Sequence, residues 1–223
     1  MERTGEEREP PKLREIAYDS FTRHLLANAV RPGQFVSQRE LVELTGLTLG
    51  AIRELVPRLE AEGLVKTVPQ RGMQVAHIDL GLIRDAYQFR LFLEKEAVAL
   101  FVETASDETI AAIRARHEDI LRRAEQGVTS PDLAAEAQAV DWGFHDTIID
   151  ALSNEIIAKA YRVNSIKIRL IRQELTRIDG LVVPVMNEHL TVIAAMETRD
   201  PTLAASALAK HIDSARRRAL GLR

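Results

Sequence analysis

From residue 79 onward, the chain reads as a succession of amphipathic helices with short connections. Apolar residues recur at helical spacing over residues 79–104, where Asp79 is suited to cap the helix. Start and stop signals delimit further helices over residues 107–126, with Asp107 as the expected cap, and over residues 130–152, 153–178, 184–198 and 200–220. Short connections make consecutive helices antiparallel neighbours. Residues 79–223 are therefore predicted to form an all-α antiparallel bundle of about six helices.

Residues 13–76 have shorter elements. A helical pattern begins at Leu13 and ends before the turn at Arg31-Pro32-Gly33, and Ser37 and Thr48 are suited to cap the next two helices, over residues 38–45 and 48–62. Two strand-like runs follow, over residues 64–68 and 73–76. Three helices followed by a hairpin predict a winged helix-turn-helix. Residues 1–12 are expected to be a flexible tail, and residues 77–78 a linker.

Composition excludes several classes of protein. With 46% hydrophobic and 28% charged residues, the balance is that of an ordinary globular protein. The absence of cysteine excludes disulfides, a cysteine nucleophile and a thiolate metal site, and it fits a reducing cytoplasm. The sequence shows neither a secretory signal nor a membrane span, so we expect a cytoplasmic protein without a membrane partner. The net charge of −3 argues against general polyanion binding.

Four polar residues of the helical region are spaced to meet at one point. Asp141 and His145 are four residues apart and therefore share one helical face. The sequence Asp200-Pro201 predicts a turn into a new helix, and His189 and His211 each lie eleven positions from Asp200, since 200 − 189 = 211 − 200 = 11. In an antiparallel hairpin these two histidines should stand level. The layout predicts a divalent metal site.

Three nitrogen ligands and one carboxylate suit several ions. Zinc is the first expectation, and Ni²⁺, Fe²⁺ or Mn²⁺ would also accept this donor set. The simpler interpretation is that each residue is an ordinary helix residue, but the joint spacing favours a metal.

The first region resembles GntR-type bacterial transcription regulators. The residues that carry the resemblance are Pro32-Gly33, Arg39-Glu40-Leu41, Ile52-Arg53-Glu54-Leu55, Leu59-Glu60-Ala61-Glu62-Gly63-Leu64-Val65 and Arg71-Gly72. The resemblance implies DNA binding, with the third helix in the major groove and the wing on the adjacent backbone or minor groove. The DNA-binding residues it implies are Arg39, Thr48, Arg53, Arg71 and Gly72.

Two features depart from that family pattern. Leu49 stands where most members carry a second arginine, so one guanine or phosphate contact is missing. Pro57 lies inside the third helix, where a proline removes a hydrogen bond, so a bend is expected between Glu54 and Arg58. Both features leave the operator sequence open. Over residues 13–78 there are eight Lys and Arg against seven Asp and Glu, so tight DNA binding should need two copies of this region.

The second region resembles the FCD ligand-binding domain of the FadR branch of that family. The residues that carry the resemblance are Arg90 with Leu93-Glu94, Asp141 with Phe144-His145, Asn154, Glu188-His189 and His211. In metal-dependent members, the positions of Asp141, His145, His189 and His211 bind the ion, which coordinates a small carboxylate effector.

A carboxylate effector would need a nearby cation. Arg90 matches a family position that often faces the pocket, and a structural ion pair with Glu94 is the alternative. Asn164 and Arg169 are expected roughly level with the metal residues, as effector-lining side chains or, alternatively, as solvent-facing or structural ones. Trp142, the sole tryptophan, is expected in the core.

Together these features predict a homodimeric transcription regulator of double-stranded, pseudo-palindromic operator DNA. A small carboxylate at or near the metal would change the placement of the two DNA-binding heads, and repression relieved by the effector is the expected direction. Two alternatives stay open. Three histidines and an aspartate around an ion could activate water in a hydrolase, or the metal could be purely structural.

Overall fold

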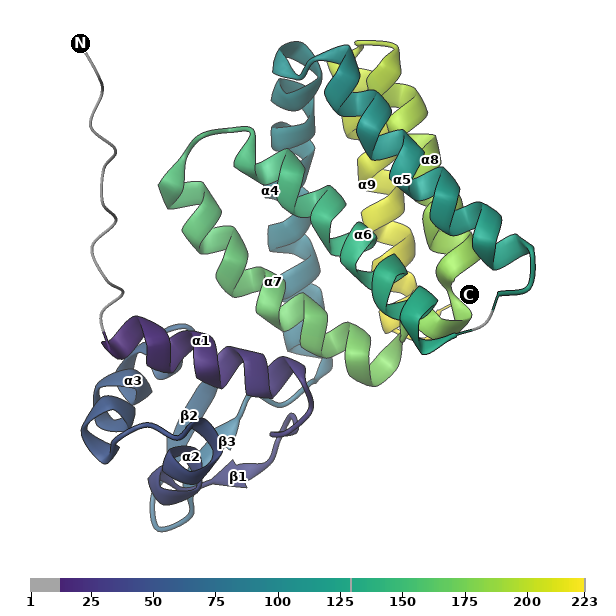
Figure 1. Ribbon diagram of the computed structural model, residues 1–223. Helices are drawn as coiled ribbons and strands as arrows, with labels where there is room; N and C mark the ends of the chain where they lie inside the picture. Colours follow the sequence, from purple (N-terminus) through teal and green to yellow (C-terminus); the bar gives the residue numbers. More distant parts are fainter. Residues whose placement is uncertain (1–12, 129, 223) are drawn as a thin grey trace, which may run out of the picture. The chain divides into compact units, whose positions relative to one another are not determined.

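The computed structural model describes residues 13–128 and 130–222, so the expected tail over residues 1–12 lies outside the described residues. The chain is mainly helical and carries one small antiparallel sheet, which confirms the predicted fold class (Figure 1). Contacts divide the chain into two compact units, with the boundary between Ile78 and Asp79.

The first unit is a three-helix structure with a sheet of order β1-β3-β2. Helix α1 packs on α2 and α3, and large apolar side chains such as Phe21, Leu41 and Ile52 are fully buried. Strand β1 was not predicted, because two residues are too few to show an alternating pattern. The elements of this unit are α1 (Leu13–Leu26), β1 (Phe35–Val36), α2 (Gln38–Thr45), α3 (Leu49–Ala61), β2 (Val65–Val68) and β3 (Gly72–Val75).

Helices α2 and α3 begin at the capping residues that the sequence indicated. The hydroxyl of Ser37 accepts a hydrogen bond from the Glu40 amide, and the Glu40 carboxylate accepts one from the Ser37 amide, which together make a capping box. The Thr48 hydroxyl accepts a hydrogen bond from the Ala51 amide at 3.3 Å. Helix α3 runs without interruption through Pro57, and the expected bend there stays a prediction.

The second unit is built of six long α-helices and one short 3-10 helix among the described residues. Three expected boundaries were wrong. Ser106, not Asp107, caps the second helix. The fourth helix ends at Leu175 rather than near Ile178, where a separate 3-10 turn begins, and the fifth begins at Val182 rather than Pro184. No helix in the described part of the chain is long and apolar enough to cross a membrane. The elements are α4 (Leu80–Thr104), α5 (Asp107–Glu125), α6 (Pro131–Asp150), α7 (Glu155–Leu175), η1 (Ile178–Gly180), α8 (Val182–Glu197) and α9 (Pro201–Ala219).

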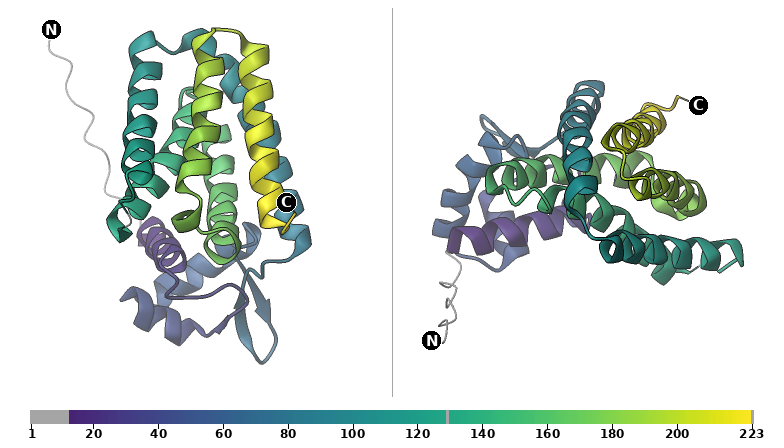
Figure 2. Two further views of the ribbon diagram at one scale, coloured as in Figure 1. Left: turned by 90° about the vertical axis from the view of Figure 1, so that its right-hand side faces the viewer. Right: turned by 90° about the horizontal axis from the view of Figure 1, so that it is seen from above.

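Helix α4 is the central element of this unit. It packs against α9, α7 and α6, and the view from above in Figure 2 shows these helices around it. Helices α8 and α9 lie side by side and are joined at Asp200, whose carboxylate caps α9 by accepting hydrogen bonds from the Thr202 and Leu203 amides. The interior of the bundle is not wholly apolar. It buries a set of polar side chains, namely Arg90, Glu94, His117, Asp141, His145, Asn164, Arg172, His189 and His211.

Candidate metal centre and DNA-binding face

The four residues predicted to bind a metal come together inside the bundle. Asp141 and His145 lie one turn apart on α6, His189 lies on α8 and His211 on α9, and all four are buried. One nitrogen from each of the three histidines lies within 4.8 Å of those of the other two. His189 Nε2 is 3.2 Å from His211 Nε2 and 3.4 Å from Asp141 Oδ1. The equal spacing from Asp200 therefore brings the two hairpin histidines level.

A buried carboxylate orients His145. His145 Nδ1 lies 2.7 Å from Glu94 Oε2, and because an ionised carboxylate only accepts, Nδ1 must donate. Burial raises the pKa of Glu94, but the charge of Arg90 and the contact with His145 outweigh it and hold that pKa well below its usual range. His145 Nε2 therefore carries a lone pair, and it is buried without a partner.

A second carboxylate orients His211 in the same way. His211 Nδ1 donates to Glu188 Oε2 at 2.9 Å, which leaves Nε2 as the free lone pair. Glu188 is held by two hydrogen bonds from Arg218, at 2.6 and 2.9 Å, and by one from Ser214. These contacts outweigh the effect of burial and keep the pKa of Glu188 well below its usual range.

A histidine relay orients His189. The Ile113 carbonyl can only accept, so His117 Nδ1 donates to it at 2.7 Å, and His117 Nε2 is left as an acceptor. His189 Nδ1 lies 3.1 Å from that acceptor and must donate to it. Burial lowers the pKa values of both His117 and His189, so each ring is neutral and its tautomer is fixed. The lone pair of His189 is again on Nε2.

The donor set fits a divalent cation. Burial lowers the pKa of His211, and burial together with the charge of Arg90 lowers that of His145 to about 4, so the histidines are neutral. Three Nε2 lone pairs then converge with no proton between them, beside Asp141 Oδ1, which is buried without a hydrogen-bond partner. These atoms repel one another unless a positive ion lies among them. Imidazole nitrogen and carboxylate oxygen are ligands that Zn²⁺ and its neighbours accept.

Arg172 holds the other oxygen of the aspartate. Its Nη1 donates to Asp141 Oδ2, and both side chains are buried. Burial raises the pKa of Asp141, but the charge of Arg172 outweighs it, so the net shift is downward. The aspartate is therefore ionised, with Oδ2 occupied and Oδ1 available. Hydrogen-bonded outer partners of this kind are typical of metal-binding carboxylates and histidines.

The three predicted effector residues line one cavity next to the histidines. Its volume is about 10 Å³, which is about the space of one water molecule. Arg90 donates to Glu94 at 2.7 Å, so the alternative ion pair forms, yet the same side chain also lines the cavity. The lining residues are Arg90, Trp142, His145, Tyr161, Asn164, Ser165, Ile168, Arg169 and Arg172.

Trp142, which was expected in the core, is a wall of this cavity. Its side chain is only partly buried, and the guanidinium of Arg169 lies over the indole ring, 4.2 Å from the centroid. Asn164 is held in place by a hydrogen bond from Nδ2 to the Ala86 carbonyl. Arg172 was missed, although it follows Arg169 at a spacing of three and thus on the same helical face.

Other residues of the centre were also missed. Glu188 adjoins His189 in the sequence but was quoted only for the family resemblance, and its contact with His211 depends on how α8 and α9 pack. His117 had no signal at all, because nothing in the sequence shows that α5 lies against α8.

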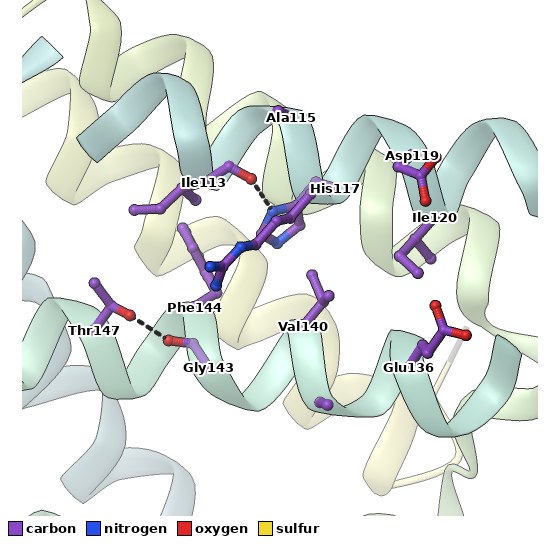
Figure 3. A pocket seen from close by; sticks show the side chains of 12 residues that line it. Ile113, Ala115, His117, Asp119, Ile120, Glu136, Val140, Gly143, Phe144 and Thr147 are labelled. Atoms are coloured by element: carbon purple, nitrogen blue, oxygen red, sulfur yellow. Dashed lines mark hydrogen bonds between the residues drawn. The ribbon is translucent and has the colours of Figure 1, made fainter. Parts of the chain in front are cut away.

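A larger cavity lies between α5 and α6, on the other side of His117 (Figure 3). Its volume is about 590 Å³, and its lining includes Ile113, Val140 and Phe144. Since both nitrogens of His117 are engaged, this residue offers only ring carbon atoms to the cavity. Phe144 packs edge-on against His117 and lies 4.6 Å from the His189 ring, between centroids. This cavity therefore borders the histidine cluster without exposing a metal-binding atom.

Replacing Glu188 with glutamine should lower the affinity for Zn²⁺ by about 10- to 100-fold, because it removes the ionised acceptor that orients His211. Competition with a chromophoric chelator measures the change. Glu197→Gln is a matched control, since Glu197 also lies on α8 and pairs with an arginine, Arg114, but contacts none of the clustered histidines. Equal zinc affinities for the two variants would contradict the orienting role.

The predicted DNA-binding residues lie on α2, α3 and the wing. Arg39 and Arg53 are exposed, and neither forms an ion pair within the described part of the chain. Thr48 caps α3, so its hydroxyl is partly committed to the backbone. Arg71 lies in the turn between β2 and β3, with its guanidinium 5.0 Å from the centroid of the Phe35 ring.

Gly72 is required by the geometry of the wing. Its φ is +89°, and a Cβ built there would come within 2.9 Å of the Val36 carbonyl oxygen. Arg58 makes two contacts within the unit. Its Nε lies 3.0 Å from Glu62 Oε1, and its guanidinium carbon lies 3.6 Å from the centroid of the Tyr18 ring.

Comparison with known proteins agrees with this architecture. The chain is 31% identical to the Nta operon transcriptional regulator of Aminobacter aminovorans. The match extends over 142 residues, which are 64% of this chain and 65% of the relative. The chain is 22% identical to the uncharacterized HTH-type transcriptional regulator YdhC of Bacillus subtilis (strain 168), over 61% of this chain and 59% of the relative. The chain thus spans less than two thirds of the length of these relatives.

Solved structures share the fold at low sequence identity. McbR/YncC of E. coli has a TM-score of 0.72 at 18% identity, with 92% of this chain and 95% of that chain covered. A GntR transcriptional regulator from Rhodococcus sp. RHA1 has a TM-score of 0.74 at 17% identity, with 95% and 99% covered. The metal-free FCD domain of TM0439 has a TM-score of 0.55 at 20% identity, with 66% and 96% covered.

Two protein families match the two units separately. The gntR family of bacterial regulatory proteins matches residues 13–75, and the FCD domain matches residues 85–214, which is more than half of the chain. With its winged helix-turn-helix followed by a helical bundle, the chain belongs to the GntR family of bacterial regulatory proteins and carries an FCD domain.

Proposed function

We propose that this protein is a DNA-binding transcription regulator, controlled by a small carboxylate metabolite that binds at a divalent metal in the FCD domain. The observation that carries the proposal is a buried cluster of three histidine nitrogens, with the unpartnered Asp141 Oδ1 lying 3.4 Å from His189 Nε2. Orphaned buried acceptors of this kind are costly without a cation. Asp141, His145, His189 and His211 would hold the ion, with zinc as the first candidate and Ni²⁺, Fe²⁺ or Mn²⁺ as the others.

The residues around the centre support effector binding. When bound, the ion would supply a positive charge and open coordination positions for a carboxylate. Arg90, Asn164 and Arg169 line the cavity beside His145, and a guanidinium is suited to hold a carboxylate through two N–H groups. A purely structural metal would need no adjoining cavity lined by arginines, and so the effector-binding role is favoured.

The surroundings of the histidines favour a regulator over a hydrolase. A metal-dependent hydrolase needs a general base within reach of the attacking water. Besides the proposed ligand Asp141, two carboxylates contact the histidines, Glu94 and Glu188. Each is engaged by an arginine and has a lowered pKa, so neither is suited to take a proton. The relatives reported above are also named as transcriptional regulators.

Operator binding would use Arg39, Thr48, Arg53, Arg71 and Gly72 in each of two heads. A pseudo-palindromic site with half-sites about one helical turn apart requires a homodimer. An exposed apolar stripe on α4, formed by Phe89, Phe92 and Leu100, supports association of two helical domains. Effector binding would reorder the helices around the centre and so change the spacing of the heads, with release of DNA as the expected direction.

A gel-shift titration tests this function. The full chain, loaded with Zn²⁺, should form a specific complex with DNA from upstream of its own gene, and a set of small carboxylates should include at least one that weakens it. A shuffled DNA of the same length is the control, and chelator-treated protein should lose the response to carboxylate. If no specific complex forms at any carboxylate concentration, with or without zinc, the proposal fails.

A further inference from the structure

We propose that the effector is a short dicarboxylate, held as a dianion between the ion site at His145 and the wall formed by Trp142 and Arg169. This inference rests on the proposed function and specifies the chemical class that the centre selects. Two observations carry it: the balance of charge around the cavity, and two buried N–H groups that have no acceptor.

The charge around the cavity is balanced before an ion binds. Three arginines line it, and each pairs with a carboxylate: Arg90 with Glu94, Arg169 with Asp146, and Arg172 with Asp141. Asp146 is shared with Arg162, which also pairs with Asp150. Four positive and four negative charges sum to zero, and histidines coordinate as neutral ligands. On the far side of His211, the charges of Glu188 and Arg218 also cancel.

A divalent ion would therefore leave this buried centre with two positive charges. Uncompensated charge is costly in a region of low dielectric, so the ligand that completes the centre should bring two negative charges. A monocarboxylate would compensate only half. A dicarboxylate compensates both positive charges, provided that its second carboxylate also finds hydrogen-bond donors.

Two such donors are present on the wall of the same cavity. Trp142 Nε1 and Arg169 Nε are buried and have no hydrogen-bond partner. The stacking of the guanidinium over the indole places both donors in one rigid unit. Arg169 Nη2 donates a hydrogen bond to Asp146 Oδ2 at 3.2 Å, which holds that end of the guanidinium, while Nε–H has no acceptor. An acceptor arriving with the effector would satisfy both groups.

A short chain suits this cavity best, because it requires the least widening. With a volume of about 10 Å³, it must widen to admit any organic ligand. Arg169 keeps 21% of its side chain exposed and Trp142 is only partly buried, so this wall borders solvent, whereas Arg90 and His145 are enclosed. The second carboxylate would thus contact this outer wall, and the first would face the enclosed ion site.

Trp142 also provides the measurement. It is the single tryptophan of the chain, so its fluorescence reports directly on this cavity. The zinc-loaded full chain would be titrated with succinate and with succinamate, which has nearly the same shape but one carboxylate replaced by an amide. Succinate should bind at least about tenfold more tightly, as expected for the loss of a charged hydrogen-bond acceptor. Malonate and glutarate then measure the preferred length.

Two conservative variants locate the second carboxylate. Trp142→Phe keeps the ring but removes the N–H, and Arg169→Gln removes the cation. By isothermal titration calorimetry, each should weaken succinate binding by about tenfold or more and weaken succinamate binding by a smaller factor, because an amide oxygen is a neutral acceptor. Arg177→Gln is the matched control, because Arg177 follows the same helix but pairs with Asp179 away from the cavity.

The outcomes separate this inference from the proposed function. Equal affinities for succinate and succinamate, or an unchanged succinate affinity in both wall variants, would overturn the dianion while leaving a metal-dependent carboxylate regulator intact. If the zinc-loaded chain binds none of the four compounds, the dicarboxylate is ruled out, whereas the proposed function is still decided by the gel-shift titration with other carboxylates. If the chain fails to bind zinc, both proposals are wrong.

Discussion

Replacement of His189 by alanine is expected to lower zinc affinity by about a hundredfold to a thousandfold. Structural zinc sites contribute about 10–16 kcal/mol in total, so each of four ligands accounts for about 2.5–4 kcal/mol. His189 is the ligand best placed for this test. It is fully buried, and its Nε2 is the atom closest to both His211 Nε2 and Asp141 Oδ1. Its loss therefore removes a ligand from the middle of the set.

Chelator competition and elemental analysis of the purified variant give the measurement. His24→Ala is the control, because His24 lies on α1 in the other compact unit and bonds only to the Ser20 carbonyl among the described contacts. Added zinc should also raise the melting temperature of the wild-type chain and of the control, but not that of His189→Ala. A His189→Ala protein that retains stoichiometric zinc after dialysis would show that the ion does not bind at this cluster.

Replacement of Arg53 by alanine should weaken operator binding by about thirtyfold or more. An arginine that reads guanine contributes about 1–3 kcal/mol, and a homodimer loses the contact twice, which gives about 2–6 kcal/mol. The structure places Arg53 on the exposed face of α3, while Ile52 and Leu55 of the same helix are buried. Among the described residues, none forms an ion pair with the Arg53 side chain, so its replacement removes no such contact and folding should be unaffected.

Fluorescence anisotropy with labelled operator DNA measures this effect, at one fixed salt concentration because phosphate contacts make the affinity salt-dependent. Arg122→Ala on α5 is the matched control, since it removes the same charge from an exposed residue of the other unit. If Arg53→Ala and Arg122→Ala bind the operator equally well, the recognition helix does not read DNA through Arg53.

The local start signals of the helices could be predicted well from the sequence. Ser37, Thr48, Asp79 and Asp200 cap the helices that they were expected to cap, because capping depends on a side chain and on amides only two or three residues away. The three wrong boundaries, at Asp107, near Ile178 and at Pro184, also concern local choices, such as that between adjacent capping candidates or between an α-helix and a 3-10 turn. None affects the metal centre.

The sequence by itself determined the two pairs of residues from which the histidine cluster is built. Helical periodicity places Asp141 beside His145, and the hairpin at Asp200 places His189 level with His211; both follow from the regular rise of the helix. The positions of the helices and of the turn are enough to predict these two pairs, because both are encoded by neighbouring residues.

Only the tertiary structure decided how the centre works. Glu94, His117, Glu188 and Arg172 come from four different helices, and their contacts with the predicted ligands depend on how those helices pack and rotate against one another. No spacing within a single helix specifies such distances. The tautomers of the histidines, the unpartnered donors on Trp142 and Arg169, and the balance of charge around the cavity all follow from that packing.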